Sequence, residues 1–71
     1  MNRYSAEKLH HSKWTAVKPR NREKHFIVTR VLRDESEAVS KCLLEAVHSG
    51  REQLLDWRDL RDTTNWLQGW K

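Results

Sequence analysis

The sequence has very few of the residues that cross-link a chain or let it wrap around a phosphate. Its single cysteine, Cys42, excludes a disulfide framework within the chain, and its two glycines, Gly50 and Gly69, exclude a glycine-rich phosphate-binding loop. No window approaches the roughly 20 apolar residues of a membrane span. Residues 1–14 also lack the apolar core of a signal peptide. We therefore expect a cytoplasmic protein that does not contact the membrane.

Potential metal ligands are present but poorly spaced. A zinc site needs four converging ligands, which usually come along the sequence as close pairs separated by about two to four residues. The histidines at positions 10, 11, 25 and 48 form no such pair with one another or with Cys42. We expect no metal site and no other cofactor.

Groups for catalysis are equally scarce. Cys42 could act as a nucleophile with His25 or His48 as its base, and Asp56 could pair with Asp59. However, Cys42 lies in the most apolar stretch of the chain, where a thiol is buried and unreactive. The sequence therefore predicts a non-catalytic protein with no small-molecule substrate.

The charge is unevenly distributed along the 71 residues. Residues 1–33 contain nine Lys and Arg against two Glu, whereas residues 34–71 contain five against eight acidic residues. A basic half followed by an acidic half permits contact with a polyanion, self-association or internal charge pairing. A chain of this length forms one small domain, which buries only about 60% of its unfolded surface.

The first half of the sequence indicates strands. Residues 1–11 are polar and predict a flexible N-terminal arm, or a short helical turn beginning at Ser5, before a single domain at 12–71. Residues 13–17 alternate and predict a short strand, closed by a turn at 18–21 that contains Pro19. Residues 23–34 are rich in Phe, Ile, Val and Thr and predict a central strand.

Residues 39–50 fit two different elements. Val39, Leu43 and Val47 recur every four residues, so a helix at 36–49, begun by Ser36 and ended by Gly50, is one possibility. As a strand, the same segment precedes a short Gly-containing connection and a second strand ending at Trp57, which is the spacing of a β-hairpin. We favour the strand, and the helix remains the alternative, which would make the fold α+β.

The C-terminal residues hold three of the four tryptophans. Trp57 ends an alternating strand and is expected in the core, and a 3₁₀ turn should follow at 58–60. Because residues 62–65 offer capping side chains, Trp66 and Trp70 are expected on one face of a short helical turn. These elements predict a mainly β fold, a four-stranded SH3-like open barrel or meander with a C-terminal helical turn.

Several motifs carry a resemblance to a known family. The segments KWTAVKPRNREKHFIVTR, LEAVHSGRE, LDWRDLRD and WLQGW resemble a family of small tryptophan-rich bacterial proteins of unassigned function, over residues 8–71. The segment LDWRDLRD is also similar to the strand and following turn of small SH3-like barrels. The resemblance implies no catalytic residue, ligand or partner.

Two surfaces are candidates for binding. Trp66 and Trp70 could contact a protein partner or a second copy of the chain, which is the function that we expect. The alternative is single-stranded RNA or DNA, because Lys and Arg neutralise phosphates and aromatic rings stack on bases. That surface would be the basic loop 18–24 and its neighbour, with contacts from Lys13, Lys18, Arg20, Arg22 and Lys24.

Overall fold

The computed structural model describes residues 5–71, and within them five strands form one antiparallel sheet. Of two short 3₁₀ helices, η1 (Ala6–Lys8) comes before the first strand and η2 (Trp57–Arg61) lies between the fourth and the fifth. The strands are β1 (Lys13–Arg20), β2 (Glu23–Arg33), β3 (Val39–Ala46), β4 (Glu52–Asp56) and β5 (Trp66–Gln68). In this part of the chain no helix is long and apolar enough to cross a membrane.

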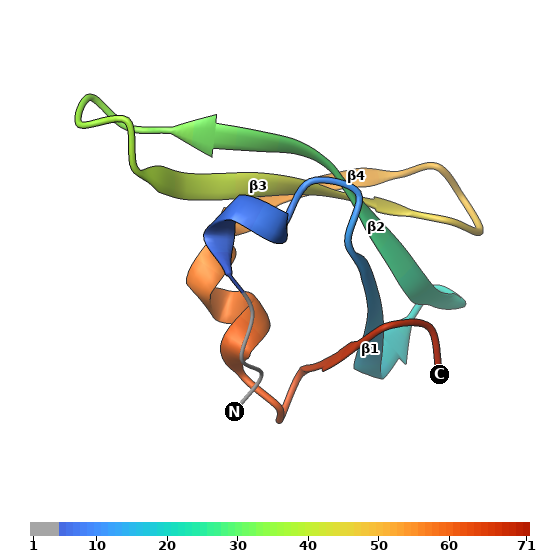
Figure 1. The fold of residues 1–71 in the computed structure, drawn as a ribbon. Helices are drawn as coiled ribbons and strands as arrows, with labels where there is room; N and C mark the ends of the chain where they lie inside the picture. The colour runs from blue at the N-terminus through green and yellow to red at the C-terminus, as the bar shows by residue number, and fades with distance from the viewer. Residues whose placement is uncertain (1–4) are drawn as a thin grey trace.

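The strand order in the sheet is β4-β3-β2-β1-β5 (Figure 1). The first four strands form a meander, and β5 then returns through η2 to pair with β1, with Thr15 opposite Leu67. The predicted mainly β fold is confirmed, with β2 at the centre of the sheet. The meander has the four strands that were predicted, and the sheet has one strand more, because β5 adds to β1 and leaves the sheet open between β4 and β5.

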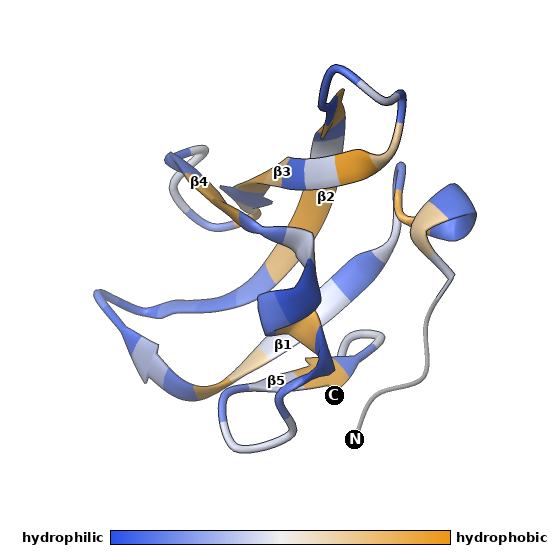
Figure 2. Ribbon diagram, turned by 90° about the vertical axis from the view of Figure 1, so that its left-hand side faces the viewer, coloured by the Kyte–Doolittle hydropathy of each residue, from blue (hydrophilic) through white to orange (hydrophobic). Residues whose placement is uncertain are grey.

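The most apolar strands, β2 and β3, form the middle of the sheet (Figure 2). Their alternating residues point to one side, where Phe26 lies opposite Ala46 and Val28 lies opposite Leu44, all four buried. Burial of every second residue is the pattern of a strand, in which successive side chains point to opposite faces. The strand at residues 39–46 is therefore confirmed, and the alternative helix at 36–49 is wrong.

The hairpin between β1 and β2 differs from the prediction. β1 does not end at Val17 but continues through Pro19 to Arg20. Its pairing with β2 is irregular between Thr15 and Arg20, and such an interruption tolerates Pro19, which has no backbone N–H to donate. The turn itself consists of Asn21 and Arg22, with φ angles of 55° and 62°. Two consecutive positive φ angles are typical of a type I′ turn, which matches the twist of a hairpin.

The core lies on one side of the sheet and includes a residue from the predicted N-terminal arm. Trp14 and Leu9 are both completely buried. The Trp14 ring N–H donates to Ser12 Oγ at 2.8 Å, and Ser12 Oγ–H donates to the Leu9 carbonyl at 2.6 Å. Ser5 is the N-cap of η1, and its hydroxyl accepts from the Glu7 N–H, so the short helical turn that was the alternative to a flexible arm is present. The part of the predicted arm at residues 1–4 lies outside the described residues.

The C-terminal segment contains a strand where a helical turn was expected. Trp66 begins β5, and Gly69, with a φ of 79°, turns the chain before Trp70. Trp66 and Trp70 therefore do not share the face of a helix, because the backbone N–H and C=O groups of this segment pair with β1 instead. The 3₁₀ turn is confirmed as η2, but in it Leu60 is buried and Trp57 is only partly buried against the core.

Candidate binding groove

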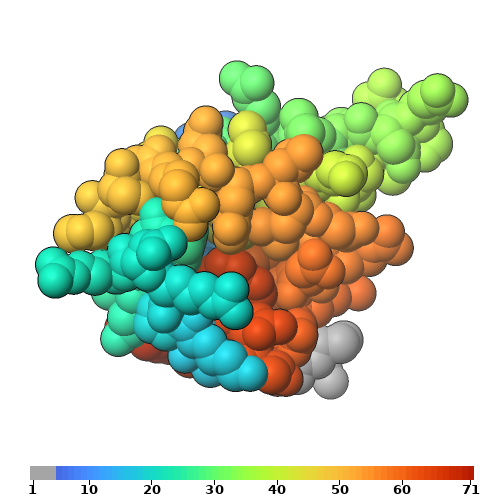
Figure 3. Space-filling model, turned by 180° about the vertical axis from the view of Figure 1, so that it is seen from behind, coloured from blue at the N-terminus to red at the C-terminus, as the bar shows by residue number. Residues whose placement is uncertain are grey.

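A groove of about 400 Å³ lies between the edge strand β4 on one side and β1, with Trp66 of β5, on the other. Figure 3 looks onto it, with the C-terminal segment visible between β4 and the hairpin of β1 and β2. Twelve residues line the groove: Ala16, Lys18, Arg20, Glu23, Phe26, Arg51, Gln53, Leu55, Asp59, Asp62, Asn65 and Trp66. Because β4 and β5 are not paired to each other, the sheet stays open along this line.

Aromatic and aliphatic side chains form the floor of the groove. Trp66 packs edge-to-face on Phe26, with 5.3 Å between ring centroids and 83° between ring planes. Phe26 belongs to the buried core, whereas Trp66 and Leu55 are partly exposed and only border it. The floor is therefore the part of the apolar interior that the chain leaves accessible.

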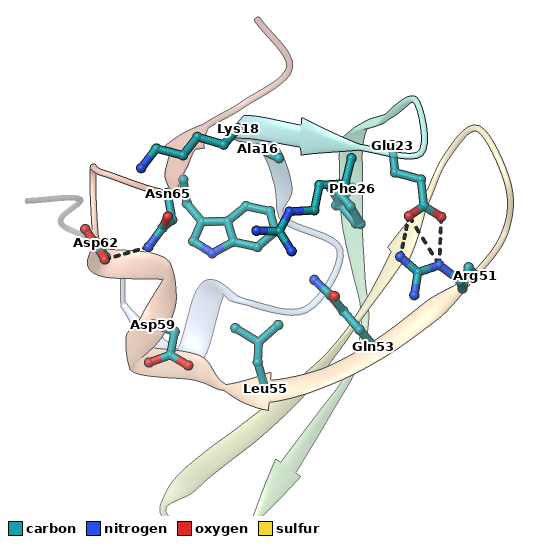
Figure 4. A pocket seen from close by; sticks show the side chains of 12 residues that line it. Ala16, Lys18, Glu23, Phe26, Arg51, Gln53, Leu55, Asp59, Asp62 and Asn65 are labelled. Atoms are coloured by element: carbon teal, nitrogen blue, oxygen red, sulfur yellow. Dashed lines mark hydrogen bonds and ion pairs between the residues drawn. The ribbon is translucent and has the colours of Figure 1, made fainter.

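One end of the groove is closed by an ion pair between Glu23 and Arg51 (Figure 4). Arg51 Nε donates to Glu23 Oε2 at 3.0 Å, and the Ser49 hydroxyl donates to the same oxygen. These hydrogen bonds hold the pKa of the almost completely buried Glu23 at about 2, well below its ordinary value. The pair therefore links the first residue of β2 to the residue just before β4 at this end of the groove.

The other end is formed by η2 and the turn that follows it. Asp62 shapes this turn, because its carboxylate accepts from the Thr64 N–H at 2.9 Å and from Asn65 Nδ2 at 2.8 Å, and these bonds lower its pKa. Asp59 lies beside it at the groove (Figure 4). Among the described residues, Asp59 has no ion pair or side-chain hydrogen bond. Its carboxylate can accept from a ligand.

Three basic and three acidic side chains line the groove, so the site has no net charge. Lys18 and Arg20 project from β1 on the side opposite Gln53 and Leu55 of β4. Neither cation takes part in an ion pair within residues 5–71. The arrangement offers an apolar floor with separate donors and acceptors at its rim.

The two tryptophans predicted to bind a partner lie in different places. Trp66 lines the groove, whereas Trp70 packs beside His25, with ring centroids 5.8 Å apart, and is 44% exposed. The Trp70 ring N–H donates to the Phe26 carbonyl at 3.0 Å, and Lys13 Nζ lies 4.7 Å from the ring centroid. Trp70 is outside the groove.

The predicted nucleic-acid contacts are likewise divided. Lys18 and Arg20 are brought together at the groove, Arg22 lies in the exposed hairpin turn, and Lys24 does not line the groove. Lys13 lies over Trp70 instead. Trp14, the aromatic neighbour of this basic stretch, is completely buried and cannot stack on a base.

Several groove residues were not singled out from the sequence. Leu55 and Gln53 belong to β4, which was predicted as the second strand of a hairpin. Because they alternate with Leu54, the sequence could have indicated that they share one face of that strand. Arg51 meets Glu23 across 28 residues of sequence, and no local pattern indicates such a contact.

Cys42 and the histidines lie apart from the groove lining. Within residues 5–71 no group of three or more His, Cys, Asp or Glu side chains could hold a metal ion. Burial raises the pKa of the Cys42 thiol to about 11, with a smaller contribution from the charges of Asp56 and Asp59. The thiol therefore stays protonated at neutral pH and is a poor nucleophile.

Comparison with known proteins gives a family but no described relative. Neither the curated proteins nor the solved structures contain a match to this chain. A family model described as "Tryptophan-rich protein (DUF2389)" matches residues 12–71, which include all five strands and every residue of the groove. The chain therefore belongs to this tryptophan-rich family.

Proposed function

We propose that this chain is a non-catalytic binding module that holds an extended segment of a partner protein in the groove between β4 and β1, over Trp66 of β5. The observation that carries the proposal is the composition of the groove. An accessible Trp66 on an apolar floor lies between cations on β1 and a carboxylate, Asp59, on η2. Aromatic anchors with polar groups at the rim are typical of protein-binding surfaces.

The balance of charge favours a polypeptide over a polyanion in this groove. Asp59 and Asp62 would repel phosphates that Lys18 and Arg20 attract, whereas a polypeptide can carry both signs. Six of the twelve lining side chains are exposed. Since a small-molecule site buries most of its ligand, such an open rim fits a longer ligand that continues beyond the groove.

The test is a selection of peptides from a random display library on the parent protein, followed by titration of the selected peptides. Truncating Trp66 to Ala should weaken binding about 30-fold or more, because a central aromatic anchor contributes about 2 kcal/mol or more. The matched control is Trp70→Ala, which removes the same side chain outside the groove and should leave the affinity within about twofold. Equal losses in both variants, or none in either, would refute the groove as the site.

Single-stranded nucleic acid is a second candidate, supported by the basic hairpin. Lys18, Arg20, Arg22 and Lys24 are all exposed, and within the described residues none is in an ion pair. If they contact phosphates, log affinity should fall with log salt at about −0.7 per neutralised phosphate. The double variant R20Q/R22Q should reduce that slope by about one to two units for every sequence tested. No binding of mixed oligonucleotides at low salt would eliminate this candidate.

We also propose that the module acts in the cytoplasm. A lone buried thiol such as Cys42 suits a reducing compartment, where small domains do without disulfides. The check is fractionation of cells that express the tagged chain.

A further inference from the structure

β4 is an edge strand of the sheet. One of its backbone edges pairs with β3, and within the described residues no strand pairs with the other edge. Gln53 and Leu55 line the groove, so the alternating residues Glu52, Leu54 and Asp56 point to the opposite, outer face of the sheet. An edge strand of this kind can accept another strand through its backbone.

The outer face of β4 has an acid–apolar–acid pattern. Leu54 is 52% exposed and lies opposite Leu43 of β3, while Glu52 lies opposite Glu45. The carboxylate of Asp56 caps η2, pairs with Arg58 and belongs to a residue that lies opposite Lys41 of β3. Glu52, in contrast, accepts a long hydrogen bond from Thr29, at 3.4 Å, and has no ion pair within residues 5–71. Glu52 is therefore the acid best able to contact a partner.

The same pattern disfavours a second copy of this chain as the occupant of the edge. In an antiparallel pair of two β4 strands centred on Leu54, Glu52 of each copy would lie opposite Asp56 of the other. Like charges directly opposite each other destabilise a strand pair. A partner strand with basic residues at those two positions would instead be stabilised.

We propose that the partner segment adds to the free edge of β4 as a further strand, with a basic–x–apolar–x–basic sequence. Its basic side chains lie beside Glu52 and Asp56, and its apolar side chain packs on Leu54. Its alternate side chains enter the groove toward Trp66, so this inference rests on the proposed function. Backbone hydrogen bonds to β4 then supply affinity, and side chains on both faces supply specificity.

The experiment uses two synthetic peptides that differ only in charge, with the cores Lys-Thr-Leu-Thr-Lys and Glu-Thr-Leu-Thr-Glu. We expect the Lys peptide to slow amide hydrogen exchange in β4 and to shift the Trp66 indole signal in nuclear magnetic resonance spectra. We expect the Glu peptide to bind more weakly. In the variant Glu52→Lys the ratio of the two affinities should change about two- to fivefold toward the Glu peptide, the size of one cross-strand charge pair.

The matched control is Glu35→Lys, the same charge change in the exposed connection between β2 and β3. It should leave the ratio of the two affinities unchanged. A peptide that shifts Trp66 without slowing any β4 amide would overturn strand addition and leave the groove proposal standing. Slowed β4 amides with equal binding to parent and Trp66→Ala would support strand addition and refute the groove.

The oligomeric state supplies the remaining outcome. Sedimentation of the parent at high concentration should show a monomer. A dimer in which β4 amides are protected, and which Glu52→Lys strengthens, would identify a second copy as the occupant and overturn the proposal of a basic partner strand.

Discussion

Trp14 and Trp66 lie on neighbouring strands, β1 and β5, yet their surroundings are opposite. Trp14 is completely buried, and its ring N–H is satisfied by Ser12. Trp66 is partly exposed in the groove, beside charged side chains. Phe26 separates the two regions, since it lies opposite Trp14 across the β1–β2 pair and packs edge-to-face on Trp66.

The difference between these regions follows from what covers each of them. The residues before β1 fold back onto the core, where Leu9 is buried and the His11 N–H donates to the Val28 carbonyl at 2.8 Å. Between β4 and β5 no such segment of the described chain closes the sheet. The same residue type is therefore structural in one region and available for binding in the other.

Removing Trp14 should have the largest effect on stability. Trp14→Ala should lower the free energy of unfolding by about 3 to 5 kcal/mol, because a fully buried ring leaves a cavity. A domain of this size has only about 4 to 10 kcal/mol in total, so the variant should be largely unfolded at 37 °C. Urea unfolding followed by circular dichroism measures the loss. Unfolding like that of the parent would show that the buried region does not hold the fold.

Removing Trp66 should lower the stability less than removing Trp14 does, and its main effect should be on binding. Because the ring is only partly buried, Trp66→Ala should lower the free energy of unfolding by about 1 to 2 kcal/mol, and the folded fraction should stay high. Urea unfolding of this variant beside Trp14→Ala tests the contrast. A loss as large as that of Trp14→Ala would place Trp66 in the core and remove the distinction between the two regions.

The Glu23–Arg51 pair at the end of the groove should make stability depend on pH. The pKa of Glu23 is lowered from 4.5 to about 2, so its ionised form favours the folded state. This contribution is complete above about pH 4.5 and is lost as the pH falls toward 2. Thermal melts from pH 7 to 2 should show a smaller acid destabilisation in Glu23→Gln than in the parent.

The control for this pH series is Glu35→Gln, in the exposed β2–β3 connection. Its melting temperature should follow that of the parent across the whole range. We expect the effect at Glu23 to be smaller than that of Trp14→Ala, because Arg51 is 58% exposed and solvent screens the pair. A parent-like pH profile in Glu23→Gln would show that the pair does not stabilise the groove.

The smallest effect on stability is expected at the free edge. Leu54→Thr should change the free energy of unfolding by no more than about 0.5 kcal/mol, since the side chain is half exposed and threonine suits a strand. Binding of the Lys peptide should nevertheless weaken, which titration would detect. A large loss of stability would indicate that Leu54 is already packed in solution, as in a dimer.

The central strands could be predicted because their signal is local. The composition of residues 23–33 is typical of a central strand, whereas residues 39–46 fitted a helix equally well by periodicity, and the hairpin spacing of the residues that follow them favoured the strand. The capping side chains at 62–65 were also informative, since Asp62 does organise a turn there. What followed the turn could not be predicted, because Trp66–Gln68 form a strand only by pairing with β1, about 50 residues away.

The sequence by itself determined the central strand β2 and the 3₁₀ turn predicted at 58–60, and it favoured the mainly β class over α+β, because composition and turn signals act over a few residues. Only the tertiary structure decided which tryptophan is buried, which lines a groove, and that Trp70 lies apart from Trp66. It also brought Glu23 to Arg51 and left β4 unpaired at the edge. The physical reason is that burial and charge pairing depend on contacts between segments distant in the sequence, and a local pattern carries no information about those contacts.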